Sequence, residues 1–115
     1  MQITIVALGF LGMGLTGLIR PSYVVGIFGL KPDTPDARNE VRAVYGGFGV
    51  AIAALLWSTF AIPDIRGGVI ISVAVALAGM ATGRLIATVI ERPSGVPVIV
   101  FLVEVAAAGL LVTAY

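Results

Sequence analysis

The chain contains no cysteine and no histidine among its 115 residues. These absences exclude disulfides, thiolate nucleophiles, thiolate or imidazole metal sites and the usual general base at neutral pH. Charged residues are also scarce, at 11% of the chain, and the seven basic ones are dispersed instead of forming the basic stripe of a nucleic-acid-binding protein. We therefore expect no metal, no cofactor and no nucleic-acid partner, and this composition favours a non-enzymatic protein over an enzyme.

Apolar sequence, in contrast, is abundant. Hydrophobic residues make up 59% of the chain, and the mean hydropathy is +1.11, far above the range of soluble domains. These values indicate an integral membrane protein. Because each crossing takes about 20 residues, the length allows about four membrane helices in a single domain.

Proline divides the chain into four apolar segments. All six prolines fall at or near the junctions between segments, where a residue without an N–H group ends a helix or is tolerated in its first turn. The predicted fold is all-α, an integral membrane four-helix bundle with short loops. It forms one domain over residues 1–115, with spans at about 2–19, 41–62, 67–90 and 96–115.

Two features lie between the first and second spans. Thr34, Pro35 and Asp36 are typical of an N-cap, a first helical position and a first-turn acid, so the second helix is predicted to begin here, outside the membrane. The segment from Ser22 to Leu30 is apolar but too short to span. It either forms an interfacial helix after the first span or packs over the bundle.

The connections differ in charge on the two sides of the membrane. Only Arg66 lies on one side, and the other side carries Arg20, Lys31, Arg38, Arg42 and Arg92. By the positive-inside rule, the basic side is cytoplasmic and both termini are outside. The first span lacks the basic region and cleavage site of a signal peptide, so we expect it to remain in the mature protein.

Arg84 and Glu104 are charged residues well inside apolar segments. A charge at the centre of a spanning helix costs roughly 2.5–3.5 kcal/mol on translocon scales, so such residues are usually paired and face the protein interior. At about 1.5 Å of rise per residue, Arg84 lies about 10 Å and Glu104 about 12 Å from the same side. Since the third and fourth spans must be antiparallel neighbours, we predict a salt bridge between these residues.

Further polar residues on the second span are predicted to join this pair. Arg38, Arg42, Tyr45 and Gly49 follow the helical spacing of a single face, and Tyr45 extends toward the layer of the ion pair. One interpretation is an ion pair that only fixes the rotation of two helices. The other is a site whose surplus positive charge binds an anionic lipid headgroup or a small acid. The candidate polar cluster consists of Arg42, Tyr45, Arg84 and Glu104.

Small residues form a second pattern, which indicates close helix packing. Gly79 and Gly83 have GxxxG spacing on the third span, and Gly47 lies in a ladder between Ala43 and Ala51. These ridges pack either within one bundle or against a partner or a second copy of the chain. They favour an accessory or structural subunit of a larger membrane complex, with membrane lipids, other membrane subunits or itself as partners. One alternative is a binding or transport protein that uses the polar cluster. The other is a membrane enzyme acting on a lipid or quinone, with Glu104 as acid or base and Tyr45 as donor, which the lack of histidine, cysteine and an acidic metal cluster disfavours.

The segment from Ala37 to Gly47 resembles the domain of unknown function 4345 family, in which an acidic residue, an arginine and Tyr-Gly-Gly open the second helix. The resemblance continues through Gly29-Leu30, Gly83-Arg84, Pro93-Ser94 and Glu104. This family consists of small bacterial proteins with four predicted membrane helices and no established activity. The resemblance therefore implies a four-helix fold in the bacterial inner (plasma) membrane and no catalytic residue.

Overall fold

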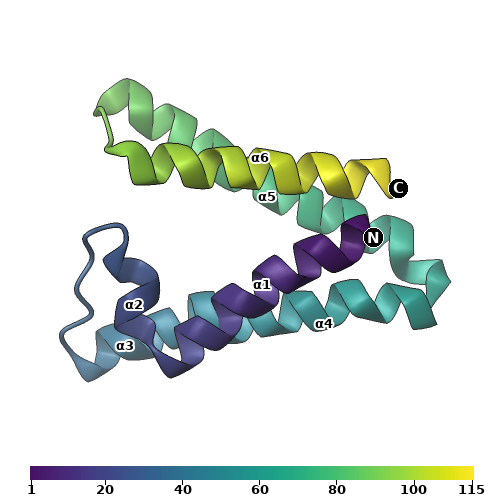
Figure 1. The fold of residues 1–115 in the computed structure, drawn as a ribbon, viewed down its shortest axis with the longest axis horizontal. Helices are drawn as coiled ribbons and strands as arrows, with labels where there is room; N and C mark the ends of the chain where they lie inside the picture. Colours follow the sequence, from purple (N-terminus) through teal and green to yellow (C-terminus); the bar gives the residue numbers. More distant parts are fainter.

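The computed structural model describes residues 1–115 and contains only helices (Figure 1). Four helical stretches are long and apolar enough to cross a membrane, at Gln2–Ile19, Pro35–Ala61, Pro63–Ile90 and Gly95–Thr113. The predicted all-α membrane fold is thus confirmed. In chain order the elements are α1 (Gln2–Ile19), α2 (Pro21–Gly26), α3 (Pro35–Val41), the π-helix η1 (Arg42–Gly47), α4 (Phe48–Ala61), the 3₁₀ helix η2 (Pro63–Ile65), α5 (Arg66–Ile90) and α6 (Gly95–Thr113).

The second long helix begins at the residues predicted for it. The side chain of Thr34 accepts a hydrogen bond of 3.1 Å from the backbone N–H of Ala37, and Pro35 occupies the first turn together with Asp36. The hydroxyl thereby satisfies one N–H group that the helix itself leaves unpaired. The N-cap prediction is confirmed, and α3 precedes the apolar stretch of this helix.

The four long helices form two pairs, which we call the first arm (α1 with η1 and α4) and the second arm (α5 with α6). Figure 1 shows that the arms meet at the end that holds both termini, and diverge toward the end that holds the α2–α3 segment and the α5–α6 connection. We call these the terminal end and the connection end. At the terminal end, the amide nitrogen Nε2 of Gln2 donates to the hydroxyl of Thr113 at 3.5 Å.

The hydrophobic core draws on both arms and lies toward the terminal end. On α5, none of the buried residues lies beyond Ala81, and Val89 and Ile90 are 86% and 74% exposed. The connection-side halves of the two arms therefore present apolar side chains to whatever surrounds them in the membrane. The core consists of Ile3, Val6, Ala7, Ala53, Leu56, Val69, Ile70, Val73, Ala74, Leu77 and Leu111.

Glycines allow the backbones of the first arm to touch. A Cβ atom at Gly14 would lie 2.6 Å from the backbone nitrogen of Val50, and one at Gly49 would lie 2.7 Å from the carbonyl oxygen of Phe10. At Gly17 the nearest atom would be the backbone nitrogen of Gly46, at 2.9 Å. These separations are too short for any side chain, so α1 packs on η1 and α4 through the close approach that small residues permit in membranes.

Within the second long helix, η1 interrupts the α-helical spacing. A π-helix pairs residue i with i+5 and so inserts one extra residue into the turn. Val41 and Gly46, five residues apart, are both buried. The single face predicted for Arg38, Arg42, Tyr45 and Gly49 assumed regular α-helical spacing, which does not hold across this turn.

We expect Gly14→Ala to destabilise the protein by about 1–3 kcal/mol, since its methyl group would press against backbone atoms that have no rotamer to change. Gly12→Ala is the matched control on the same helix, because a Cβ there meets nothing within 4 Å. The control should be neutral, or stabilise the helix by up to about 1 kcal/mol. Thermal unfolding of both variants in mild detergent measures the difference, and equal midpoints would contradict the close approach.

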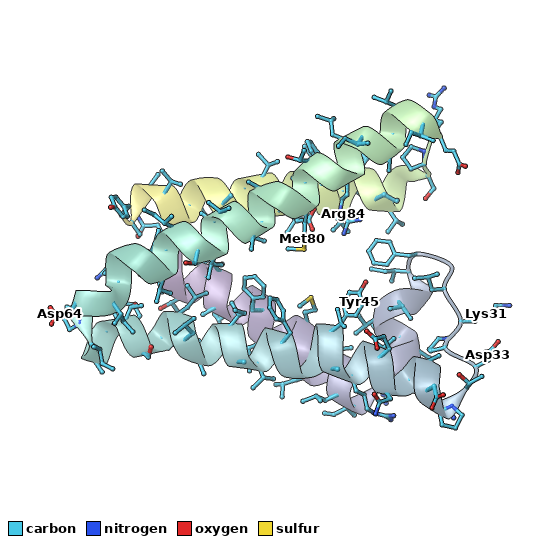
Figure 2. The ribbon with its side chains drawn as sticks, turned by 180° about the vertical axis from the view of Figure 1, so that it is seen from behind. Lys31, Asp33, Tyr45, Asp64, Met80 and Arg84 are labelled. Carbon is cyan, nitrogen blue, oxygen red and sulfur yellow. The ribbon has the colours of Figure 1, made fainter.

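The arrangement of the ends also makes the predicted orientation testable, because Asp33 and Asp64 lie at opposite ends of the molecule (Figure 2). The chain has no native cysteine, so single cysteines can be introduced without background. If the basic connection end is cytoplasmic, an impermeant thiol reagent should label Asp64→Cys in intact cells and leave Asp33→Cys unlabelled. The opposite labelling pattern would reverse the orientation.

Candidate functional site

Arg84 on α5 and Glu104 on α6 form an ion pair across the second arm. The guanidinium Nε lies 2.7 Å from Oε1 of Glu104, and Nη2 donates to Oε2 at 3.4 Å. Both carboxylate oxygens thus accept hydrogen bonds from one arginine, and this bidentate geometry makes such pairs strong. The contact predicted from matched depth on antiparallel neighbours is present.

Glu104 and Arg84 differ in how much of their surface is exposed. Glu104 is 6% exposed, and the side chain of Arg84 is 29% exposed. The carboxylate is therefore enclosed between α5 and α6, while part of the guanidinium faces away from its partner. Figure 2 shows Arg84 and Met80 on the side of the second arm that faces the first arm.

Phe28, which follows α2, contacts the guanidinium group of Arg84. Its ring centroid lies 5.4 Å from the guanidinium carbon, within the range of a cation–π interaction. The chain turns sharply here because Gly29 has a φ of +77°, which residues with a side chain rarely adopt. Between the two alternatives for the segment after the first span, Val25 at 2% exposure and this contact favour packing over the bundle.

Arg42 contacts α1 instead of the ion pair. Its Nε donates to the carbonyl oxygen of Leu18 at 3.1 Å. Leu18 lies in the last turn of α1, where carbonyl groups lack partners within the helix and a cation is favoured by the helix dipole. Arg42 therefore caps α1, and the structure does not add it to the Arg84–Glu104 pair. Arg38 likewise binds the segment that precedes α3, through a 3.2 Å hydrogen bond from Nη1 to the carbonyl oxygen of Pro32.

Tyr45 remains on the side of the ion pair. It is half-buried on η1 and points from the first arm toward the second arm (Figure 2). None of the side-chain hydrogen bonds within the chain uses its hydroxyl group. Tyr45 and Arg84 thus lie on the sides of the two arms that face each other (Figure 2), while Glu104 pairs with Arg84 between α5 and α6. Phe28, which was not among the predicted site residues, contacts the guanidinium of Arg84.

The three glycines predicted to pack helices make no close contact in the chain. A Cβ at Gly79 or Gly83 would meet nothing within 4 Å, and at Gly47 the nearest atom would be 3.8 Å away. Packing inside the bundle therefore does not explain them. The close contacts are made by other glycines, because η1 shifts the register of the second helix and because the buried face of α5 carries Leu77 and Ala81 instead.

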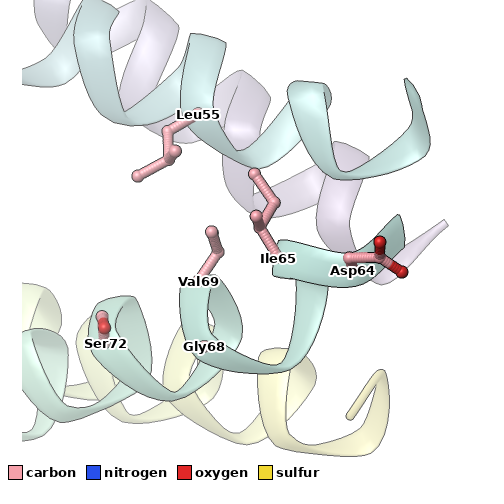
Figure 3. Close-up of a pocket in the computed structure, with 6 residues that line it drawn as sticks. All are labelled: Leu55, Asp64, Ile65, Gly68, Val69 and Ser72. Atoms are coloured by element: carbon pink, nitrogen blue, oxygen red, sulfur yellow. The ribbon is translucent and has the colours of Figure 1, made fainter. Parts of the chain in front are cut away.

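A second polar feature lies at the terminal end, where a shallow pocket opens between α4 and the beginning of α5 (Figure 3). Asp64 is its only charged residue, and its walls are mostly apolar. The remaining lining residues are Leu55, Ile65, Gly68, Val69 and Ser72. A single exposed carboxylate offers no second group with which to hold or transform a ligand.

The ion pair predicts a coupled response to substitution. Arg84→Ala and Glu104→Ala should each lower the stability in detergent, and the double variant should lose less than the sum, with a coupling of about 0.5–3 kcal/mol. Arg66→Ala combined with Glu104→Ala is the control, because Arg66 contacts Phe60 and forms no ion pair. Strict additivity for the Arg84 pair in thermal unfolding would contradict an energetic link.

Comparison with known proteins identifies a family for the chain but assigns it no activity. No curated protein and no solved structure matches the chain significantly. A family described as Domain of unknown function (DUF4345) matches residues 1–115, the whole chain. Of the segment that carried the resemblance in the sequence, Ala37 to Gly47, the part up to Val41 belongs to α3 and the part from Arg42 forms the π-helix η1. The chain therefore belongs to the DUF4345 family.

Proposed function

We propose that the protein is a non-enzymatic subunit of a membrane complex, which packs laterally through α5 against a helix of another chain. The observation that carries this proposal is the pair Gly79 and Gly83, exposed on α5 with nothing near them. Ala87, also exposed, continues the same four-residue spacing. GxxxG spacing is a common means of close helix association in lipid.

The position of this ridge on α5 supports an external partner. Gly79 follows the buried Leu77 by two residues, which at 3.6 residues per turn places it on the opposite side of the helix. A glycine inside a helix costs roughly 0.5–1 kcal/mol relative to alanine. Within the chain, neither glycine offsets this cost by a close contact, whereas a partner helix on the outer face would use both.

The charges of the site weigh against the alternative function, binding of an anionic headgroup or small acid. That alternative depended on two arginines beside one carboxylate. Arg42 is instead bound to the carbonyl oxygen of Leu18, and Arg84 is neutralised by Glu104. An anion added at this position would leave an uncompensated negative charge in a medium of low dielectric constant, which is unfavourable.

We expect Gly79→Leu and Gly83→Leu to release a second chain that wild-type protein retains after mild extraction, because leucine prevents close approach of backbones. Gly109→Leu on α6 is the matched control, since Gly109 is also exposed with nothing within 4 Å. Native mass spectrometry measures the mass of the complex and separates a second copy from a different chain. All three variants should keep the wild-type helical content.

A wild-type protein that is extracted as a folded monomer would contradict the subunit proposal. Equal retention of the second chain by the Gly79 and Gly109 variants would do so as well, because the ridge would then have no special role.

A further inference from the structure

Arg84 has donors that nothing in the chain satisfies. Glu104 accepts only from Nε and Nη2, so the N–H groups of Nη1 have no protein acceptor. Arg84 lies six residues before the end of α5 at Ile90, which places it about 9 Å inside that end of the helix. A polar group at such a depth cannot rely on bulk water, and leaving it unpaired costs several kcal/mol. No side-chain nitrogen that lacks a partner is buried in the chain, so the unmatched N–H groups of Arg84 are accessible to an acceptor from outside the chain.

The charge balance of the pair limits what that acceptor can be. Glu104 already neutralises Arg84, and it is the only carboxylate paired with an arginine in the chain. An anion beside the pair would bring a net negative charge into the membrane interior. A neutral acceptor avoids this penalty, and carbonyl oxygen is a neutral acceptor that a molecule dissolved in the hydrocarbon layer can carry.

Tyr45 of the first arm offers a second hydrogen-bond donor, and Phe28, which follows α2, packs near the guanidinium. Tyr45 points toward the second arm with its hydroxyl unused, and Met80 lies beside Arg84 on the facing side (Figure 2). The ring of Phe28 lies 5.4 Å from the guanidinium carbon and adds an apolar wall on that side. Because the connection-side halves of the arms diverge and expose apolar side chains, a hydrocarbon chain attached to the acceptor has surfaces against which to pack.

We propose that Arg84 and Tyr45, under the ring of Phe28, bind the carbonyl group of a neutral, membrane-soluble molecule between the two arms. Two sources carry this chemistry, the acyl ester of a glycerolipid and the ring of a lipid-soluble quinone. This site is independent of the α5 ridge, since Gly79 and Gly83 lie on another face of that helix.

The test uses the full chain reconstituted in vesicles of ester-linked or ether-linked phosphatidylcholine, with and without a decyl-substituted benzoquinone. Bound molecules are measured by native mass spectrometry, and quinone affinity by titration of the thermal unfolding midpoint. Tyr45→Phe removes only the hydroxyl donor and should weaken binding by about 3- to 10-fold, the usual effect of one hydrogen bond. Tyr23→Phe is the matched control, because Tyr23 is 67% exposed on α2, and it should bind as wild type does.

Each source gives a different result. Saturable quinone binding that Tyr45→Phe weakens in both kinds of vesicle assigns a quinone. Retention of ester-linked but not ether-linked lipid, reduced in Tyr45→Phe, assigns a lipid ester. The proposal is overturned if Tyr45→Phe and Tyr23→Phe bind alike, or if neither carbonyl source is retained. The state of association is read separately, so a monomeric protein that binds the probe would refute only the subunit proposal.

Discussion

The rest of the structure depends on one constraint, which is that a charged side chain inside the membrane needs an opposite charge close enough to form an ion pair. Arg84 and Glu104 meet this requirement for each other, and in doing so they fix how α5 and α6 are rotated. Removing one partner would strand the other in a medium that solvates it poorly. The second arm is therefore held together by one specific polar contact within an otherwise apolar interface.

The first arm is held together by different means. Its helices approach so closely at Gly14 and Gly49 that backbone touches backbone, and a hydrogen bond from the exposed Arg42 ties η1 to the end of α1. Lipid tails are as apolar as leucine, so tight van der Waals contact replaces the hydrophobic effect as the source of association. The core that joins the two arms lies toward the terminal end. At the connection end, Phe28 in the segment that follows α2 contacts Arg84 of the second arm.

The sequence predicted correctly those features that depend on residues at helix ends or on the depth of a residue in the membrane. Proline and charge marked the helices, the hydroxyl of Thr34 marked an N-cap, and equal depth paired Arg84 with Glu104. It failed for contacts that depend on which side of a helix is buried. A membrane helix is apolar on all sides, so its sequence pattern does not identify the buried face. The pattern therefore left open whether Gly79 packs inside the bundle or against a partner, and the hydrogen bond from Arg42 to Leu18 was missed. The π-helix depends on contacts with α1 that lie far away in sequence.

Because of the π-helix, the number of residues in the second helix decides which way Arg42 and α3 face. Its extra residue rotates everything on the N-terminal side by about 100° relative to a regular α-helix. A relative lacking one residue between Arg42 and Gly47 would still form a helix of similar hydropathy. Arg42 would then face away from the carbonyl group of Leu18, and α3 would emerge from the membrane in another direction. Chains alike in composition can thus differ in which surface they present at the connection end.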